Sequence, residues 1–382
     1  MAYLQEGLKL ISILVDEGYS SFIVGGAVRD ILLGLDINDI DIATSATPEK
    51  LKEMFITKEA QNKYNSIKVM FNDYEFEVTT FRKDLVYLDN RHPKFEVANT
   101  LESDIVRRDF TVNALAFDKD EKLIDLVGGK ADLDNKIIRA IGNPNIRFEE
   151  DSLRILRAVY YASRLHFKIE EATYKALKEE GKLVQNLSFD RVYQMLYKMV
   201  NEKVYKEAFK LLVETYIYSY LKPFSEAIYE VYANNIDNLD WRIFLALAFN
   251  KKDLKMYSFK DKSMLDTIYY LKQNNLLDPT LIYKYQLEDL VIAYNLKKRE
   301  EKLNYSLNDL IKTYNNLPIR NIKDLDISNL EIIDLTGLQG EELGSLIKDL
   351  FTQVLKGKLT NEYTILRKYC IKYRKLLKNN SK

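Results

Sequence analysis

Two aspartates separated by one residue offer the clearest chemistry in this sequence. Asp39 and Asp41 alternate with apolar isoleucines, and in a β-strand this spacing places both carboxylates on one face. Neighbouring carboxylates repel unless a cation lies between them, and Mg²⁺ binds carboxylate oxygens while keeping sites for water and phosphate oxygens. The pair therefore predicts a catalytic Mg²⁺ site, with a solvated edge strand as the alternative. Glu77 is a candidate third catalytic carboxylate, although its acidic neighbour Glu75 makes an exposed strand face almost as good an explanation.

A glycine turn precedes the aspartate pair. The apolar run Phe22–Val24 leads into Gly25 and Gly26, and Arg29 follows where a helix should begin. Because glycine has no side chain, the backbone amides of such a turn can approach a phosphate. Gly26 and Arg29 are therefore predicted to bind the phosphates of a nucleotide.

A pair of arginines forms the third cluster. Arg107 and Arg108 stand before an apolar segment that contains Asn113. Guanidinium groups bind phosphate oxygens through two parallel N–H donors, so the pair is predicted to hold a triphosphate ahead of an apolar helical run with a buried Asn113. A charged helix start capped by Asn113 is the alternative.

The fourth cluster lies on a predicted helix. At about 100° per residue, Asp151, Arg154, Arg157 and Arg164 fall within one arc of roughly 140°, and the opposite side, including Tyr160, is apolar. An aspartate accepts from a base amino group while an arginine donates to ring nitrogens and carbonyls, so the pair Asp151 and Arg154 could read a base edge. A ladder of salt bridges along the helix is the alternative.

The sequence around these clusters divides the chain into two kinds of structure. Strand-like and helical segments mix through residues 1–142, as in an α/β or α+β head, whereas the periodicity from about Glu149 onward is helical. The switch near residues 142–144 is the clearest predicted boundary. The predicted strands are Phe22–Val24, Ile40–Ala43, Ile67–Phe71 and Phe76–Thr80.

Composition limits the possible classes of protein. The chain has 382 residues, 47% hydrophobic and 30% charged, and no net charge, which is typical of a folded globular protein. It has neither a long apolar run nor a signal-like N-terminus, so we expect a cytoplasmic protein without a membrane partner. Cys370 and two histidines cannot form a zinc cage, so any metal must bind to oxygen atoms. The basic stretch 367–382 could contact RNA, and a solvated helix end explains it equally well.

In this order the clusters resemble the class II tRNA nucleotidyltransferases and bacterial poly(A) polymerases, and most closely the bacterial CCA-adding enzymes. The matching segments are Gly25–Asp30 with Asp39–Asp41, Arg107–Ala114, Glu150–Arg154, Leu187–Arg191, Asp334–Gly340 and Val354–Asn361. The resemblance implies an α+β fold with a β-polymerase-like nucleotidyltransferase head, made of a mixed sheet with helices, and all-α neck, body and tail. The implied ranges are 1–140 for the head, 141–200 for the neck, 201–300 for the body and 301–382 for the tail.

The resemblance also implies an enzyme that adds C, C and A to the tRNA 3′ end from CTP and ATP without a nucleic-acid template. Asp39 and Asp41 would bind Mg²⁺, and the tail would grip the outer acceptor and T-arm region of tRNA. The implied nucleotide-binding residues are Gly26, Arg29, Arg107, Arg108, Asn113, Asp151, Arg154 and Arg157. Tyr160 stands where many relatives carry another arginine that faces the triphosphate.

Three activities occur on this scaffold: addition of CCA, of CC and of A. CC-adding members lack a flexible loop between the carboxylates and the paired arginines, whereas here the connection from Arg82 to Asp104 is long and includes Arg91, His92 and Pro93. CC addition is therefore disfavoured, and an A-adding enzyme or a poly(A) polymerase stays open. A catalytically inactive RNA-binding protein is the alternative from another class, and the intact carboxylate pair speaks against it.

Overall fold

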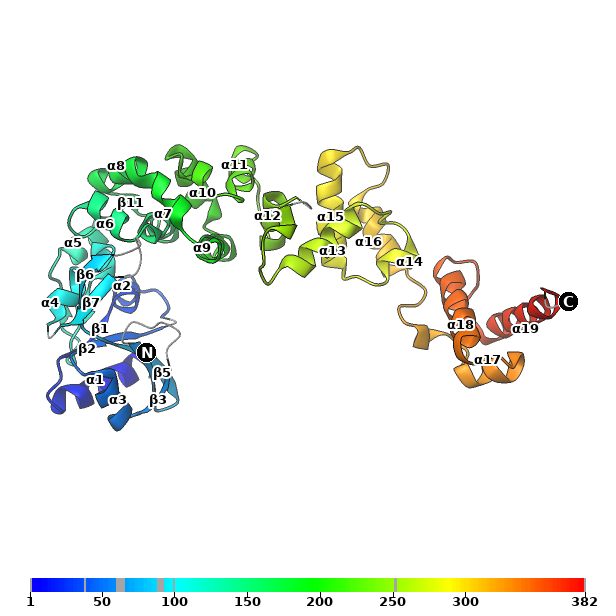
Figure 1. Ribbon diagram of the computed structural model, residues 1–382, viewed down its shortest axis with the longest axis horizontal. Coiled ribbons are helices and arrows are strands. Elements are labelled where there is room, and N and C mark those ends of the chain that lie inside the picture. Colours follow the sequence, from blue (N-terminus) through cyan, green and yellow to red (C-terminus); the bar gives the residue numbers. More distant parts are fainter. Residues whose placement is uncertain are drawn as a thin grey trace. The chain divides into compact units, whose positions relative to one another are not determined.

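The computed structural model describes residues 2–37, 39–59, 66–87, 93–98, 100–250 and 253–380. The chain forms two compact units, Met1–Trp241 and Arg242–Lys382, whose helices and strands are labelled in Figure 1. The first unit combines a mixed sheet with helices, and the second is helical in its described residues. The predicted α+β class is therefore confirmed. The finer division into head, neck, body and tail stays a prediction.

A mixed sheet of seven strands forms the base of the first unit. Its order is β3-β4-β5-β2-β1-β8-β9; β2 and β5 run parallel and the other neighbours run antiparallel. The strands are β1 (Ser21–Val24), β2 (Asp41–Thr44), β3 (Ile56–Glu59), β4 (Ser66–Phe71), β5 (Tyr74–Thr80), β8 (Ala116–Phe117) and β9 (Leu123–Ile124). All four predicted strands are present, but β2 begins at Asp41, so Asp39 lies just before it.

Alternation of apolar residues explains how the sheet is covered. Phe76 and Val78 of β5 are fully buried, whereas the alternate residues Glu75, Glu77 and Thr79 are half-buried, as expected for a strand with one face in the core. Helix α1 (Ala2–Asp16) lies against β1 and β5. Gly7 permits this close approach, because a Cβ there would lie 3.3 Å from side-chain carbons of both Ile23 and Phe76.

A strand pair and several short helices complete the head. Strands β6 (Arg82–Tyr87) and β7 (Pro93–Val97) form a separate antiparallel pair with an irregularity between Asp84 and Val86. Arg91 and His92, on which the prediction of an intact flexible loop rests, lie outside the described residues. The short elements are α2 (Gly26–Leu32), α3 (Pro48–Met54), α4 (Leu101–Ile105), η1 (Thr111–Asn113) and α5 (Gly129–Asp134).

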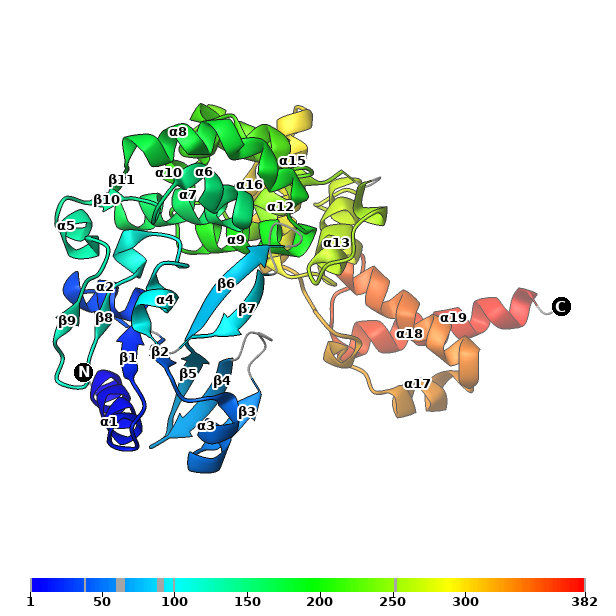
Figure 2. The same ribbon diagram turned by 60° about the vertical axis from the view of Figure 1, so that its left-hand side comes forward.

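Helices follow from Pro144, as the sequence predicts. They are α6 (Pro144–Glu150), α7 (Leu153–Leu165), α8 (Glu171–Glu180), η2 (Gly181–Asn186), α9 (Phe189–Asn201), α10 (Tyr205–Glu214), η3 (Ile217–Tyr220) and α11 (Ser225–Ala233). Figure 2 shows them above the sheet of the same unit. A two-stranded parallel ladder, β10 (Ile137–Ile138) with β11 (Lys168–Ile169), crosses the predicted boundary, so the head and the first helices are physically joined.

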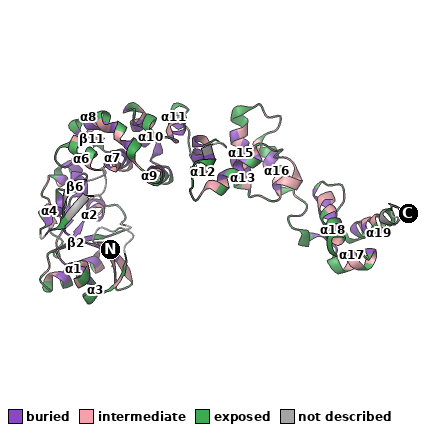
Figure 3. Cartoon of the chain, in the orientation of Figure 1, coloured by how far each residue is buried: buried purple, intermediate pink, exposed green. Residues whose placement is uncertain are grey.

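Two apolar clusters are present among the described residues of the second unit. One includes Leu271, Leu290 and Leu310, and the other includes Leu350 and Cys370; buried residues are coloured purple in Figure 3. The helices are the rest of α12 (Trp241–Ala248), η4 (Asp253–Lys255), α13 (Lys262–Lys272), α14 (Pro279–Ile282), α15 (Leu287–Glu300), α16 (Leu307–Asn315), η5 (Ile322–Asp324), α17 (Asn329–Thr336), α18 (Gly340–Leu355) and α19 (Tyr363–Asn380). None of the described helices combines the length and apolar character needed to cross a membrane.

Candidate active site

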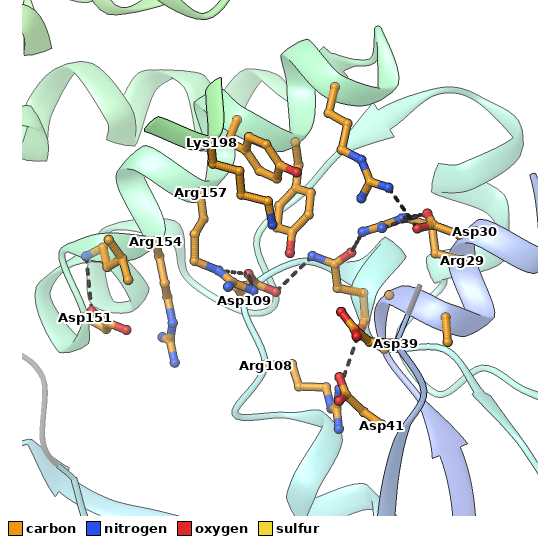
Figure 4. Close-up of a pocket in the computed structure, with 18 of the residues that line it drawn as sticks. Arg29, Asp30, Asp39, Asp41, Arg108, Asp109, Asp151, Arg154, Arg157 and Lys198 are labelled. Carbon is orange, nitrogen blue, oxygen red and sulfur yellow. Dashed lines mark hydrogen bonds and ion pairs between the residues drawn. The ribbon is translucent and has the colours of Figure 1, made fainter. Parts of the chain in front are cut away.

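A pocket of about 590 Å³ in the first unit brings the predicted clusters together. Figure 4 shows that its walls come from the head and from the helices that follow it. The charged residues that line it are Arg29, Asp30, Asp39, Asp41, Arg82, Arg107, Arg108, Asp109, Asp151, Arg154, Arg157, Arg164, Arg191, Lys198 and Glu202. Nine of these are basic and six are acidic, so the lining has an excess of three positive charges. Such a pocket favours an anionic ligand.

The glycine turn lies at one edge of the pocket. Gly25 has a φ of 79°, in the left-handed region that glycine adopts without a steric penalty. A Cβ on Gly25 would also lie 3.1 Å from Nη1 of Arg108. Gly26 follows as the first residue of α2 and lines the pocket. The turn therefore keeps the backbone open towards the pocket, and a side chain at Gly25 would obstruct Arg108.

Arg29 is held rigidly behind this turn. Its side chain is 2% exposed and lies 2.7 Å from the carboxylate of Asp30. Its Nη1 also donates to Oδ1 of Asn113, and Nδ2 of Asn113 donates to Asp109. The guanidinium lies over the ring of Tyr161, 5.1 Å from its centroid. Arg29 thus contributes a fixed positive charge to the pocket wall.

The prediction of a helical run after the paired arginines is wrong. Residues 111–113 form a single 3₁₀ turn, η1, which leads directly into β8. A short buried apolar run gives no periodicity that separates a helix from a strand, and here the strand pairing with β1 decides the outcome. Asn113 is buried as predicted, but it bridges Arg29 and Asp109 and does not cap a helix.

Asp39 and Asp41 both line the pocket, one just before β2 and one at its first residue. Asp41 is the register partner of Glu77 on the parallel strand β5, so their side chains project from the same face. Burial and, next, the charge of Glu77 raise the pKa of Asp41 to about 6, while Arg108 opposes them. Asp41 still reaches solvent through the open pocket. A divalent cation would relieve this unfavourable charge, so the pair fits the predicted metal.

Two carboxylates alone do not enclose a metal ion. In the described part of the chain, no three His, Cys, Asp or Glu side chains are grouped as a metal site. Glu77 is half-buried and does not line the pocket, and its role stays a prediction. Water or substrate oxygens would have to complete the coordination of a metal held by Asp39 and Asp41, as is usual for Mg²⁺.

One buried acid positions both paired arginines. Asp104, whose side chain is 1% exposed, lies 2.5 Å from Arg107 and 2.9 Å from Arg108. Burial raises the pKa of Asp104, but the two guanidinium groups outweigh it and hold the pKa below its ordinary value. Sequence reasoning did not single out Asp104. Its spacing of three and four residues from the arginines is the signal that could have done so.

The structure corrects the predicted single helix of the fourth cluster. Asp151 has an extended backbone at the end of α6, and its carboxylate accepts from the backbone N–H of Leu153 at the start of α7. An aspartate competes in this way with the helical hydrogen bonds of the backbone, so two helices form. Arg154 and Arg157 do lie on α7 and line the pocket. Asp151 reaches the same pocket from the loop.

The arginines of α7 are held by acids and by backbone carbonyls. Arg154 is buried, lies 2.8 Å from Glu150 and donates to the carbonyl oxygens of Arg107 and Arg147. Arg157 lies 2.6 Å from Asp109. Both arginines therefore connect the helical part to residues 104–113 of the head. These ion pairs run from α7 to α6 and to the head, whereas the alternative interpretation expected a ladder along one helix.

Several residues that line the pocket were not predicted as binding residues. Tyr160, expected on the apolar side of the helix, lines the pocket, and its hydroxyl donates to Glu202. Arg191 belongs to a segment quoted for the resemblance and lies 3.9 Å from Asp151. Arg191 and Lys198 are seven residues apart on α9, which places them on one helical face. That spacing is the signal that sequence reasoning missed.

Known families match three parts of the chain. The poly(A) polymerase head domain matches residues 21–139, the RNA and SrmB-binding site of polymerase A matches 166–228, and tRNA nucleotidyltransferase domain 2 matches 251–370. The CCA-adding enzyme of Streptococcus uberis is 32% identical over 390 residues, 96% of each chain. The chain belongs to the CCA-adding enzyme family. The CCA-adding enzyme of Bacillus subtilis is 33% identical over 84% of this chain and 86% of that protein.

Solved structures of this family share the fold. The crystal structure of the Bacillus stearothermophilus CCA-adding enzyme in complex with CTP matches with a TM-score of 0.77 and 26% identity, over 98% of both chains. The Thermotoga maritima CCA-adding enzyme complexed with tRNA has a TM-score of 0.64 at 22% identity, over 96% of this chain and 94% of that one. The predicted family resemblance is therefore confirmed.

Proposed function

We propose that this chain is a nucleotidyltransferase that adds C, C and A to the 3′ end of tRNA from CTP and ATP without a nucleic-acid template. The observation that carries the proposal is one pocket in which Asp39 and Asp41 face an excess of fixed positive charge. Relatives named CCA-adding enzymes match along 96% of the chain, which supports the same activity here. We further propose a cytoplasmic location, where tRNA and both nucleotides occur together.

The family's chemistry needs a divalent metal ion, for which we propose Mg²⁺ at Asp39 and Asp41. When bound, it would favour deprotonation of the RNA 3′-hydroxyl and neutralise charge on the phosphates. The open lining of Gly25 and Gly26 leaves space for the triphosphate, and Arg29 and Arg108 offset its negative charge from the pocket wall. The hydroxyl attacks the α-phosphate in line, and pyrophosphate leaves.

Base selection is proposed for Asp151 and Arg154, with Arg157 beside them. Asp151 contributes a carboxylate that can accept from the amino group of cytosine or adenine. Arg154 is already bound by Glu150 and by two backbone carbonyls. These bonds use three of the five N–H donors of its guanidinium, so a base would share the group with the acceptors that position it. Base selection would then depend on how the bonds of Arg154 to Glu150 and to the carbonyl oxygens of Arg107 and Arg147 rearrange when a base binds.

Addition of A alone and poly(A) synthesis are the second candidate, favoured by the match of residues 21–139 to the poly(A) polymerase head domain. The decisive experiment supplies CTP or ATP separately to tRNAs that end before CCA, after the first C and after the second C. A CCA-adding enzyme uses CTP on the first two substrates and ATP on the third. Use of ATP on the third substrate alone supports A addition, and long A tails on any RNA support a poly(A) polymerase.

The enzyme hypothesis has its own control. Replacement of Asp39 and Asp41 by alanine should abolish incorporation while tRNA binding persists. An inactive RNA-binding protein would bind tRNA and show no Mg²⁺-dependent incorporation even with the native sequence. Retained incorporation in the double variant would contradict the metal assignment.

A further inference from the structure

Helix α9 contributes one lysine to the pocket that the proposed mechanism does not use. Lys198 lies near the C-terminal end of α9, and its side chain lines the pocket. In Figure 4 the chain of Lys198 extends from its helix towards Arg157, on the side of the pocket away from Asp41. The side chain is 49% exposed, so its ammonium group is accessible to a ligand.

Lys198 differs from four arginines of the pocket in how it is held. Arg29, Arg107, Arg108 and Arg157 each have a carboxylate oxygen within 3.0 Å. The nearest carboxylate oxygen to the Lys198 ammonium, in Glu202, is 4.0 Å away, which is beyond hydrogen-bond distance. Among the described residues, no hydrogen bond to the ammonium group is present. An ammonium group has three N–H donors, and these can reach a phosphate.

The aromatic ring of Tyr160 keeps this ammonium group at the pocket wall. The nitrogen of Lys198 lies 4.7 Å from the ring centroid, which is within the range of a cation–π interaction. Tyr160 is 2% exposed, and its hydroxyl donates to Glu202 at 2.6 Å. Burial and this acid raise the pKa of Tyr160, so the hydroxyl keeps its proton. Tyr160 contacts the ammonium group of Lys198 with its ring, and Glu202 fixes the position of Tyr160 through its hydroxyl.

The charges around Lys198 favour an anion beside it. Burial lowers the pKa of Lys198, Glu202 opposes this effect, and Arg164 and Arg157 add to the lowering. Like charges held together in this way are stabilised when an anion enters. A phosphate group of the nucleotide is the anion that the pocket is proposed to bind.

We propose that Lys198 binds the β- or γ-phosphate of the incoming nucleoside triphosphate, held in place by Tyr160 and Glu202. The reacting α-phosphate must lie at Asp39 and Asp41, whereas Lys198 lies on the wall formed by α7 and α9. A contact with the outer phosphates does not depend on the base, so it serves CTP and ATP alike. The inference rests on the proposed function, since it requires a triphosphate in this pocket.

The competing explanation is an ordinary helical ion pair, and α10 provides a matched control. Lys210 lies 3.9 Å from Glu214 at the same spacing of four residues, and its side chain is 61% exposed. Lys210 does not line the pocket. Replacement of either lysine by methionine removes a charge and keeps most of the aliphatic chain, so any difference between the two variants reports on the pocket.

The test measures the dissociation constants of CMP, CDP, CTP and ATP in the absence of RNA, for the native protein and for Lys198→Met, Lys198→Arg and Lys210→Met. We expect Lys198→Met to weaken CTP and ATP alike by about tenfold, the size of one charge-assisted hydrogen bond, and to leave CMP unchanged. Lys198→Arg should retain most of the affinity, and Lys210→Met should match the native protein. Equal melting temperatures would show that the variants are folded.

Two results would overturn the inference. One is an unchanged ratio of CTP to CMP affinity in Lys198→Met, whether both affinities fall equally or neither falls. The other is a loss of the same size in Lys210→Met. A native protein that binds neither CTP nor ATP would instead overturn the proposed function itself. The two failures are distinguishable because the native protein is measured with the same four nucleotides.

Discussion

The guanidinium of Arg157 on α7 lies 2.6 Å from the carboxylate of Asp109, and this ion pair joins the helices to the head at the pocket. Asp109 is 7% exposed and also accepts from Asn113 and from the backbone N–H of Phe110. Burial raises the pKa of Asp109, but Arg157 and these hydrogen bonds outweigh it and hold the pKa below its ordinary value. The acid therefore stays ionised and stabilises the fold at neutral pH.

Asp109→Ala should lower the free energy of unfolding at pH 7 by about 2 kcal/mol, because the buried N–H groups of Phe110 and Asn113 lose their acceptor and the half-buried Arg157 loses its acid. A carboxyl group with a lowered folded pKa stabilises the fold above its ordinary pKa, and this contribution disappears as the pH falls through the folded value. The difference between the variant and the native protein should therefore narrow below about pH 4. Urea unfolding at several pH values measures it.

An exposed acid provides the control for this prediction. Asp16 has a side chain that is 73% exposed and lies 3.7 Å from Lys119. Asp16→Ala should change the free energy of unfolding by less than about 1 kcal/mol, because exposed ion pairs contribute little. Equal effects of the two substitutions would show that the pair of Asp109 and Arg157 adds no special stability.

Mg²⁺ should raise the melting temperature of the native protein and have less effect on Asp39→Asn with Asp41→Asn. A ligand that binds only the folded state adds about 2.7 kcal/mol when present at 100 times its dissociation constant. Each kcal/mol corresponds to roughly 2–4 °C in the melting temperature of a unit the size of Met1–Trp241, which contains the carboxylate pair. Thermal unfolding with Mg²⁺ and with a chelator measures the shift. An equal Mg²⁺ effect in both proteins would place the metal elsewhere.

Asp151→Asn and Asp151→Ala separate base reading from helix capping. An asparagine oxygen can still accept from the N–H of Leu153, so Asp151→Asn should keep most of the stability, whereas Asp151→Ala should lose about 1 kcal/mol. Both variants should lose discrimination among CTP, ATP, UTP and GTP. When one side-chain oxygen binds Leu153, the second carboxylate oxygen that could accept from a base is replaced by an NH2 donor in asparagine and is absent in alanine. Incorporation kinetics with each nucleotide give the selectivity. Native selectivity in Asp151→Ala would mean that Asp151 only orders the turn before α7.

The strands that carry the carboxylates were predictable because local pattern and tertiary structure agree there. Phe76 and Val78 alternate with polar residues, and the sheet buries the apolar side, so period two gave the right answer. The glycine turn was predictable for a similar reason. Gly25 has a positive φ, and glycine is the residue that adopts this backbone conformation without a steric penalty.

Other parts of the site depend on contacts that the sequence does not display. The continuous helical pattern through Asp151 gave no sign that its carboxylate would terminate one helix and begin the next. Asp104 positions Arg107 and Arg108, and only the fold brings both guanidinium groups to its one carboxylate. Lys198 and Tyr160 lie on different helices, and their contact exists only because α9 lies against α7.

The basic face of α19 should contribute to tRNA binding mainly through phosphate contacts. Lys368, Lys372 and Lys375 are exposed and lie at helical spacing, while Leu366 and Cys370 are buried on the other side. Each phosphate contact adds about 0.7–0.9 to the slope of log affinity against log salt. The triple variant with glutamine at these three positions should therefore bind tRNA more weakly and lower that slope by about 2–3.

Exposed lysines of the head provide the matched control for the tail helix. Lys9, Lys119 and Lys122 are exposed and do not line the pocket that holds the carboxylate pair. Their replacement by glutamine changes the net charge by the same three units, so it reproduces the effect of overall charge on association. Filter binding of tRNA across a range of salt concentrations compares the two triple variants. The slope of log affinity against log salt should fall only in the α19 variant, because only direct phosphate contacts release counterions. If the slope falls equally in both variants, or in neither, α19 is not part of the RNA-binding surface.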